Sequence, residues 1–114
     1  GGDGIDFSYS DIFLSNVTAR RITDKGVSVG EASRVWASNV LIEDASYGVV
    51  AKDSSVVKLD VASFHEVETP IAAYVKKPHF SGGTIYLNGV KRLNSGTDYH
   101  DAQSKFILAV GNDG

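Results

Sequence analysis

Gly26-Val27-Ser28-Val29-Gly30-Glu31 is followed 22 residues later by Gly48-Val49-Val50-Ala51-Lys52-Asp53, with glycine and apolar residues at matching positions. Gly4-Ile5-Asp6-Phe7 lies 22 residues before the first stretch, and Pro70-Ile71-Ala72-Ala73 lies 22 residues after the second. Apolar residues at every second position are typical of a β-strand, whose side chains point to opposite faces in turn. A strand that recurs at a fixed step predicts stacked, similar coils.

The stacking predicts columns of inward side chains, one residue from each coil. Two further β segments follow the first strand in each period, and their apolar residues align at steps of 22 or 23. Asn16 and Asn39 align at the same predicted corner. The predicted columns are Ile5, Val27, Val49 and Ile71; Phe7, Val29, Ala51 and Ala73; Ile12, Val35 and Val57; Leu14, Ala37 and Leu59; Ala19, Ile42 and Phe64; and Ile22, Ala45 and Val67.

Three short β segments per period and no helical periodicity predict a parallel β-solenoid. An antiparallel β-sandwich of short strands is the alternative, and the regular columns favour the solenoid. We expect about four coils over residues 1–93, with residues 76–83 as a protruding loop before Ile85 and Leu87 continue the columns. Residues 94–114 are expected to cap the open end.

Composition narrows the function classes. The 114 residues suffice for one domain, and the formal charge of −3 gives no electrostatic reason to expect nucleic acid. Cysteine is absent, and no apolar run is long enough to predict membrane insertion. Because Met is also absent and the first coil begins without a cap, we expect a piece of a larger protein. The first coil would then be covered by adjoining coils of the parent chain or by a homo-oligomer.

Three runs carry a family resemblance: Asp24-Lys25-Gly26-Val27-Ser28-Val29-Gly30-Glu31, Val50-Ala51-Lys52-Asp53 and Ala73-Tyr74-Val75-Lys76-Lys77-Pro78. They resemble β-helix segments of bacterial extracellular proteins. Over about residues 3–93 the chain resembles the right-handed parallel β-helix proteins of the pectate-lyase-like superfamily. The resemblance implies right-handed coils and an extracellular or cell-surface location. It also implies either a scaffold or an enzyme, because the superfamily contains both.

The enzyme branch is only partly matched. Gly2-Asp3-Gly4-Ile5-Asp6 resembles the first motif of polygalacturonase-type hydrolases, and Thr23-Asp24-Lys25 has lysine where a second aspartate belongs. The later histidine and arginine motifs of that family are absent. A hydrolase would use Asp3 and Asp24 as acid and base, and a lyase would use Lys52 as base. The other interpretation is that both aspartates are turn residues.

Aromatic and basic residues mark two candidate ligand sites. Tyr74, Lys76, Lys77 and His79 lie on or beside the protruding loop, where a ring and ammonium groups would bind an acidic polysaccharide. The alternative is a solvated basic loop. Trp36 is predicted to face outward, as a sugar platform or as a residue covered by the C-terminal segment.

Glu31 and Asp53 are predicted to stack on adjacent coils, where two carboxylates require a cation between them. Calcium is one candidate and a basic side chain, such as Lys52 or Arg34, is the other. Because no complete catalytic set is found, the sequence favours a non-catalytic module for surface display, assembly or glycan recognition. The alternative is a fragment of a lyase or hydrolase that acts on acidic polysaccharide.

Overall fold

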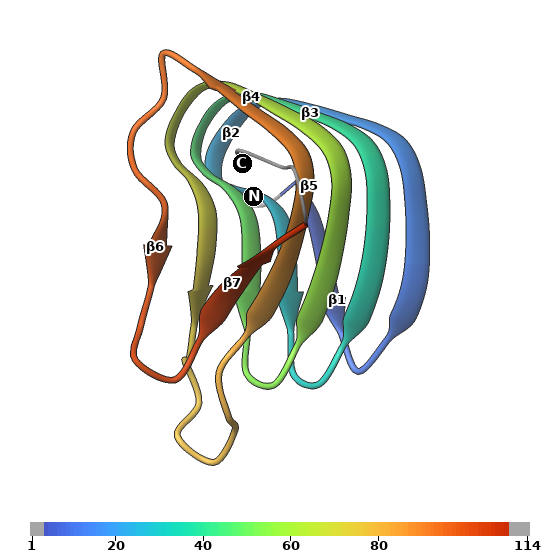
Figure 1. Ribbon diagram of the computed structural model, residues 1–114, viewed down its shortest axis with the longest axis vertical. Helices are drawn as coiled ribbons and strands as arrows, with labels where there is room; N and C mark the ends of the chain where they lie inside the picture. Colours follow the sequence, from blue (N-terminus) through green and yellow to red (C-terminus); the bar gives the residue numbers. More distant parts are fainter. Residues whose placement is uncertain (1–3, 110–114) are drawn as a thin grey trace.

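The computed structural model describes residues 4–109, which fold into a parallel β-solenoid of about five turns (Figure 1). This confirms the predicted all-β solenoid; right-handed winding stays a prediction. None of the described residues forms a helix that is long and apolar enough to cross a membrane. The strands are β1 (Ile5–Ser8), β2 (Asp11–Gly30), β3 (Arg34–Lys52), β4 (Val56–Tyr74), β5 (Thr84–Leu93), β6 (Tyr99–His100) and β7 (Lys105–Leu108).

The coils stack by parallel pairing in the order β1-β2-β3-β4-β5-β7, and β6 pairs with β4. The register joins Val27 to Val49 and Val35 to Val57, as the sequence repeat predicts. Val57 pairs in turn with Ile85, so the fourth coil resumes the column after the loop. All six predicted columns are confirmed by the strand pairing.

The columns meet inside the coils and form one core. Ile42, Leu59 and Phe64 are among the largest fully buried side chains. A single coil cannot bury these side chains, because one turn of the chain leaves them open on both sides until neighbouring coils cover them. Each coil therefore depends on its neighbours, and buried apolar area contributes about 25 cal/mol per Å².

The long strands turn corners at residues with left-handed backbone conformation. One corner column consists of Asn16, Asn39, Val61 and Gly89, with φ angles of 55°, 57°, 59° and 65°. Asn39 Nδ2 donates to Asn16 Oδ1 at 2.6 Å, which confirms the predicted pair of corner asparagines. Asparagine and glycine tolerate this conformation, whereas a β-branched residue is strained in it.

The described part of the C-terminal segment adds strands to the last coils of the stack. β7 pairs with β5 in parallel, with Phe106 beside Ile85 and Leu108 beside Leu87. The expected capping segment is therefore itself a partial coil, because its alternating apolar residues fit the inward columns and its backbone pairs with the edge of β5. This raises the predicted four coils to about five turns.

We predict that Val61→Asn raises the free energy of unfolding by about 1 kcal/mol, because asparagine relieves the left-handed strain and can extend the corner ladder. Urea unfolding followed by the fluorescence of Trp36, the single tryptophan, measures the change. Val56→Asn is the matched control, because Val56 lies on the same strand outside the corner column. An unchanged or lower urea midpoint for Val61→Asn would contradict the strain argument.

Gly48 lies where the chain leaves no room for a side chain. A Cβ atom there would overlap the Pro70 carbonyl oxygen and the Phe64 ring. We expect Gly48→Ala to destabilise the protein by about 1–3 kcal/mol, the usual cost of overpacking. Gly30→Ala is the control, because the nearest atom to its Cβ is the Lys52 Cε at 3.5 Å. Equal urea midpoints for the two variants would show that Gly48 does not limit the packing.

Candidate functional site

One outward column carries aromatic rings on successive coils. Strand pairing places Phe13 beside Trp36, then Lys58, Tyr86 and Ile107. These residues each follow an inward core residue in the chain, so alternation along the strand turns them to solvent. We call this column, with the polar residues that flank it, the aromatic face.

Of the rings of the aromatic face, Phe13 and Tyr86 are exposed and Trp36 is half-buried. The Phe13 and Trp36 rings are stacked, with centroids 4.9 Å apart and an angle of 16° between their planes. Phe13 is 78% exposed and Tyr86 is 39% exposed. Large exposed apolar surface of this kind marks a site of contact with a ligand or partner.

Lys58 is held between two rings of the column. Its Nζ lies 5.8 Å from the Trp36 ring centroid and 5.5 Å from the Tyr86 ring centroid. Both distances are within the range of a cation–π interaction. Lys58 forms no ion pair with a carboxylate among residues 4–109, so its positive charge is available to a ligand.

Polar pairs flank the aromatic column on both sides. Arg34 binds the Asp11 carboxylate with two hydrogen bonds of 3.1 and 2.8 Å, and the Arg34 hydrogen bond lowers the pKa of Asp11. On the other side, Asn88 Nδ2 donates to Asp60 Oδ1 at 2.7 Å. The surface is hollowed on either side of Lys58, toward Trp36 and toward Tyr86. The face therefore combines apolar platforms with hydrogen-bonding groups.

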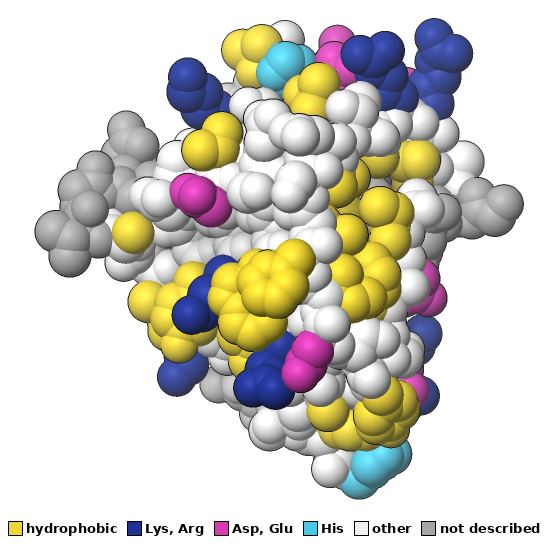
Figure 2. All heavy atoms as spheres, turned by 90° about the vertical axis from the view of Figure 1, so that its right-hand side faces the viewer, with side chains coloured by type: hydrophobic (Ala, Val, Ile, Leu, Met, Phe, Trp, Pro, Cys, Tyr) yellow, Lys and Arg dark blue, Asp and Glu magenta, His cyan; other side chains and the backbone are white. Residues whose placement is uncertain are grey.

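Figure 2 views the molecule from the side of the first coil. Hydrophobic side chains gather in the middle of this end, and a second group with Lys or Arg between its members lies to the left. The half-buried hydrophobic residues that pack against the core include Phe7, Ile12, Leu14 and Val17 from the first coil. Both groups are apolar surface that adjoins charged side chains.

Of the candidate catalytic residues the structure describes Asp24 and Lys52, and it does not bring these two together. Asp3 lies outside the described residues. Asp24 binds Lys25 at 2.7 Å in β2, where the register shifts. Lys52 is the last residue of β3 and lies beside Gly30 of the neighbouring coil. Gly30 is six residues beyond Asp24 in the chain. At about 3.3 Å per residue the separation of Asp24 and Lys52 along the strand is on the order of 20 Å.

Glu31 and Asp53 each bind the protruding loop. Lys77 Nζ lies 2.9 Å from Glu31 Oε2, and Ser8 Oγ donates to Glu31 Oε1 at 3.2 Å. Asp53 is buried, and its Oδ1 accepts from the backbone N–H groups of Lys76 and Lys77 at 2.7 and 2.9 Å. The ion-pair partner of Glu31 is thus Lys77, the charge of the predicted Lys52 also lowers the pKa of Glu31, and Arg34 binds Asp11 instead. No group of three or more His, Asp or Glu residues within 4–109 is arranged to hold a metal ion.

The predicted ligand residues fall into separate places. Lys77 is bound to Glu31, whereas Lys76 is exposed. The His79 and Phe80 rings pack together with centroids 4.5 Å apart. Tyr74 lies on β4 with its ring centroid 6.4 Å from that of Tyr99.

Of the predicted ligand residues, Trp36 alone belongs to the aromatic column. The loop itself packs back on the first coil, with the Phe80 and Tyr9 ring centroids 6.4 Å apart. The loop is therefore anchored by Lys77 and Phe80, while the side chains of Lys76, Lys77 and His79 stay exposed.

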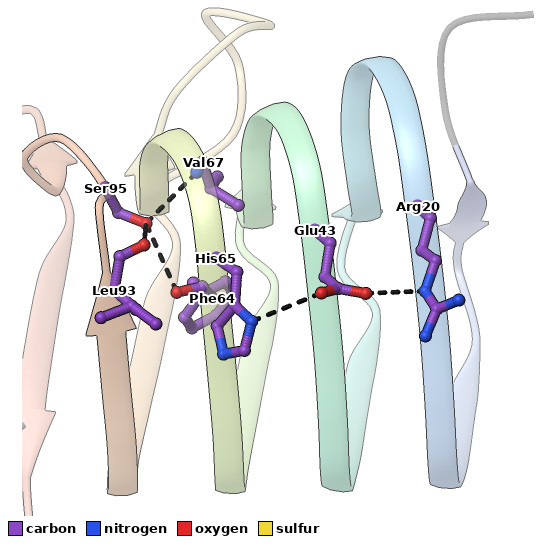
Figure 3. A network of polar contacts seen from close by, with 7 residues as sticks. All are labelled: Arg20, Glu43, Phe64, His65, Val67, Leu93 and Ser95. Atoms are coloured by element: carbon purple, nitrogen blue, oxygen red, sulfur yellow. Dashed lines mark hydrogen bonds and ion pairs between the residues drawn. The ribbon is translucent and has the colours of Figure 1, made fainter.

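A charged ladder crosses another side of the coils (Figure 3). Arg20 Nε lies 2.6 Å from one Glu43 oxygen, and His65 Nδ1 lies 3.4 Å from the other. On the fourth coil, Ser95 Oγ bonds to the Leu93 carbonyl oxygen at 3.0 Å and accepts from the Val67 N–H at 3.2 Å. These contacts join adjacent coils, and they give the ladder a structural role.

Sequence reasoning named Trp36 and missed Phe13, Lys58 and Tyr86. The signal was present, because each of them directly follows a residue of the column Ile12, Val35, Val57 and Ile85. The outward positions, aligned in the same way as the inward columns, predict this face.

Comparisons with protein-family models, with curated proteins and with solved structures give no match to this chain. The function is therefore argued from the geometry alone, and the pectate-lyase-like relationship stays a prediction.

The ion pair of Glu31 and Lys77 predicts a pH dependence. The Lys77 hydrogen bond lowers the pKa of Glu31, and Glu31 raises the pKa of Lys77. A carboxyl with a lowered pKa stabilises the folded state above its unfolded pKa, and this contribution is lost as the pH falls through the folded value. We expect Glu31→Gln to lower the urea midpoint at pH 7 and to lose this effect below about pH 4.

Glu66→Gln is the control for this experiment, because Glu66 is exposed and has no ion pair within the described chain. It should leave the urea midpoint at pH 7 nearly unchanged. A Glu31→Gln effect that is as large in acid as at pH 7 would mean that the carboxylate charge is not what anchors the loop.

Proposed function

We propose that this chain is a non-catalytic β-solenoid module that recognises an acidic glycan through its aromatic face. The observation that carries the proposal is the outward column in which Lys58 lies between Trp36 and Tyr86. Aromatic rings stack on the apolar faces of sugar rings, and the ammonium group pairs with a carboxylate. The rings stand on paired strands, which hold a binding surface more rigidly than a loop does.

The proposed ligand is a chain that lies along the stack of coils. Neighbouring coils are about 4.8 Å apart, so an extended polymer would meet a new side chain at every coil. The Arg34–Asp11 and Asn88–Asp60 pairs offer donors and acceptors to its hydroxyl groups. Acidic polysaccharides occur outside cells, so the proposal implies an extracellular or cell-surface module of a larger or oligomeric bacterial protein.

Catalysis is not part of the proposal. Glycoside hydrolysis needs two carboxyl groups about 5–10 Å apart on either side of the scissile bond, and a lyase needs its base at the substrate. Asp24 is bound to Lys25 and lies far along the strand from Lys52, which favours recognition without turnover. A calcium ion at Glu31 and Asp53 would compete with Lys77, so we expect glycan binding to be the same with calcium as with a chelator.

We predict that Trp36→Ala and Tyr86→Ala each weaken binding to polygalacturonate by about tenfold or more, equivalent to 1.4 kcal/mol, because each removes a stacking platform. Affinity electrophoresis, with and without calcium, measures the retention. Tyr99→Ala is the control, because Tyr99 is 52% exposed and lies off the face. Lys58→Gln should reduce binding to the acidic polymer more than binding to a neutral one.

The same gels test the loop as a rival site. If Lys76→Ala abolishes retention while Trp36→Ala and Tyr86→Ala do not, the loop is the binding site and the aromatic face is not. If the unmutated chain is not retained by any acidic or neutral polysaccharide, the proposal of glycan recognition is wrong.

A further inference from the structure

The two ends of the stack carry sheet edges that lack a partner within residues 4–109. At one end, residues 11–15 of β2 pair only with β3. At the other end, β7 pairs only with β5. An unpaired edge presents a row of N–H and C=O groups that can bind another strand. The parallel strand pairing that joins the coils of one copy could thus also join these two edges of different copies.

The two edges have complementary side chains. Asp11, Arg34, Val56, Thr84 and Lys105 form one continuous column, so Asp11 starts the column and Lys105 ends it. If the first coil of a second copy continued the register beyond β7, its Asp11 would lie beside Lys105. Opposite charges would then meet across the junction.

The apolar residues match in the same register. Continuing the columns places Ile12 of the second copy on Phe106, Phe13 on Ile107 and Leu14 on Leu108, by extension of the observed strand pairing. Phe13 is 78% exposed and Leu108 is 54% exposed, and the first-coil end in Figure 2 shows gathered hydrophobic side chains. Burying these residues between copies would repeat the packing inside the coils.

We propose that copies of this chain stack head to tail, with the first coil of one copy on β7 of the next. The match of Asp11 to Lys105 selects this direction. The reverse contact of two first coils sets apolar edges together without that charge pair. A head-to-tail contact uses two different surfaces and does not close on itself, so it yields a linear series. The proposal does not require a glycan, and it extends the aromatic column from copy to copy by placing Phe13 of one copy beside Ile107 of the next.

Sedimentation velocity over a dilution series of the 114-residue chain tests the proposal. We expect species larger than a dimer that grow with concentration. Lys105→Glu places two carboxylates together and should raise the concentration for half-assembly about tenfold or more. Asp11 also binds Arg34 of its own chain, so Asp11→Asn removes the junction charge without placing a cation beside Arg34 and should weaken assembly as well.

Glu66→Lys is the matched control, because it reverses the charge of an exposed residue on β4, which pairs with β3 on one side and β5 on the other. It should leave assembly unchanged, and circular dichroism confirms that each variant is folded. A chain that stays monomeric at every concentration overturns the proposal, and so does a dimer that does not grow. Equal assembly of Lys105→Glu and the unmutated chain also overturns it, because Lys105 would then not meet Asp11.

Discussion

Parallel pairing between successive coils is the constraint on which the rest of this protein depends. A single turn of the chain has no interior, so Ile42 and Phe64 become buried only because equivalent residues lie directly above and below them. The pairing fixes the register, since a slip of one residue would turn every core side chain to solvent. The sequence repeats because each coil must cover its neighbours with side chains at equivalent positions.

The corners between the straight segments require left-handed backbone conformations. Left-handed residues recur at equivalent positions, and Asn16, Asn39 and Gly89 suit that conformation. Val61 does not suit it, and it remains in the column because the pairing of the flanking segments determines the backbone on both sides. The protruding loop is likewise held by the coils on either side of it. Its ends are tied by Asp53 and Lys77, and the columns then resume with Ile85.

The proposed function uses the outward columns, because packing leaves little choice of residue in the inward ones. On one side the outward residues include the ladder of Arg20, Glu43 and His65, which joins coils. On another they form the aromatic face, where Lys58 lies between two rings. The same stacking that builds the core therefore also builds an extended surface, with one position for each coil. This geometry suits a repeating or linear partner more than a compact one.

The sequence by itself determined the coil repeat, the six inward columns, the corner asparagines and the place of the loop, because these depend on periodicity that each residue shares with its neighbours one coil away. It also named Trp36 as an outward aromatic residue. Only the tertiary structure decided that Lys77 lies beside Glu31, that Asp24 and Lys52 lie apart, and that residues 105–108 form another coil. Side-chain contacts across a corner, and the path of an irregular segment, depend on how the chain folds back in space. Neither of these two features produces a repeating pattern in the sequence.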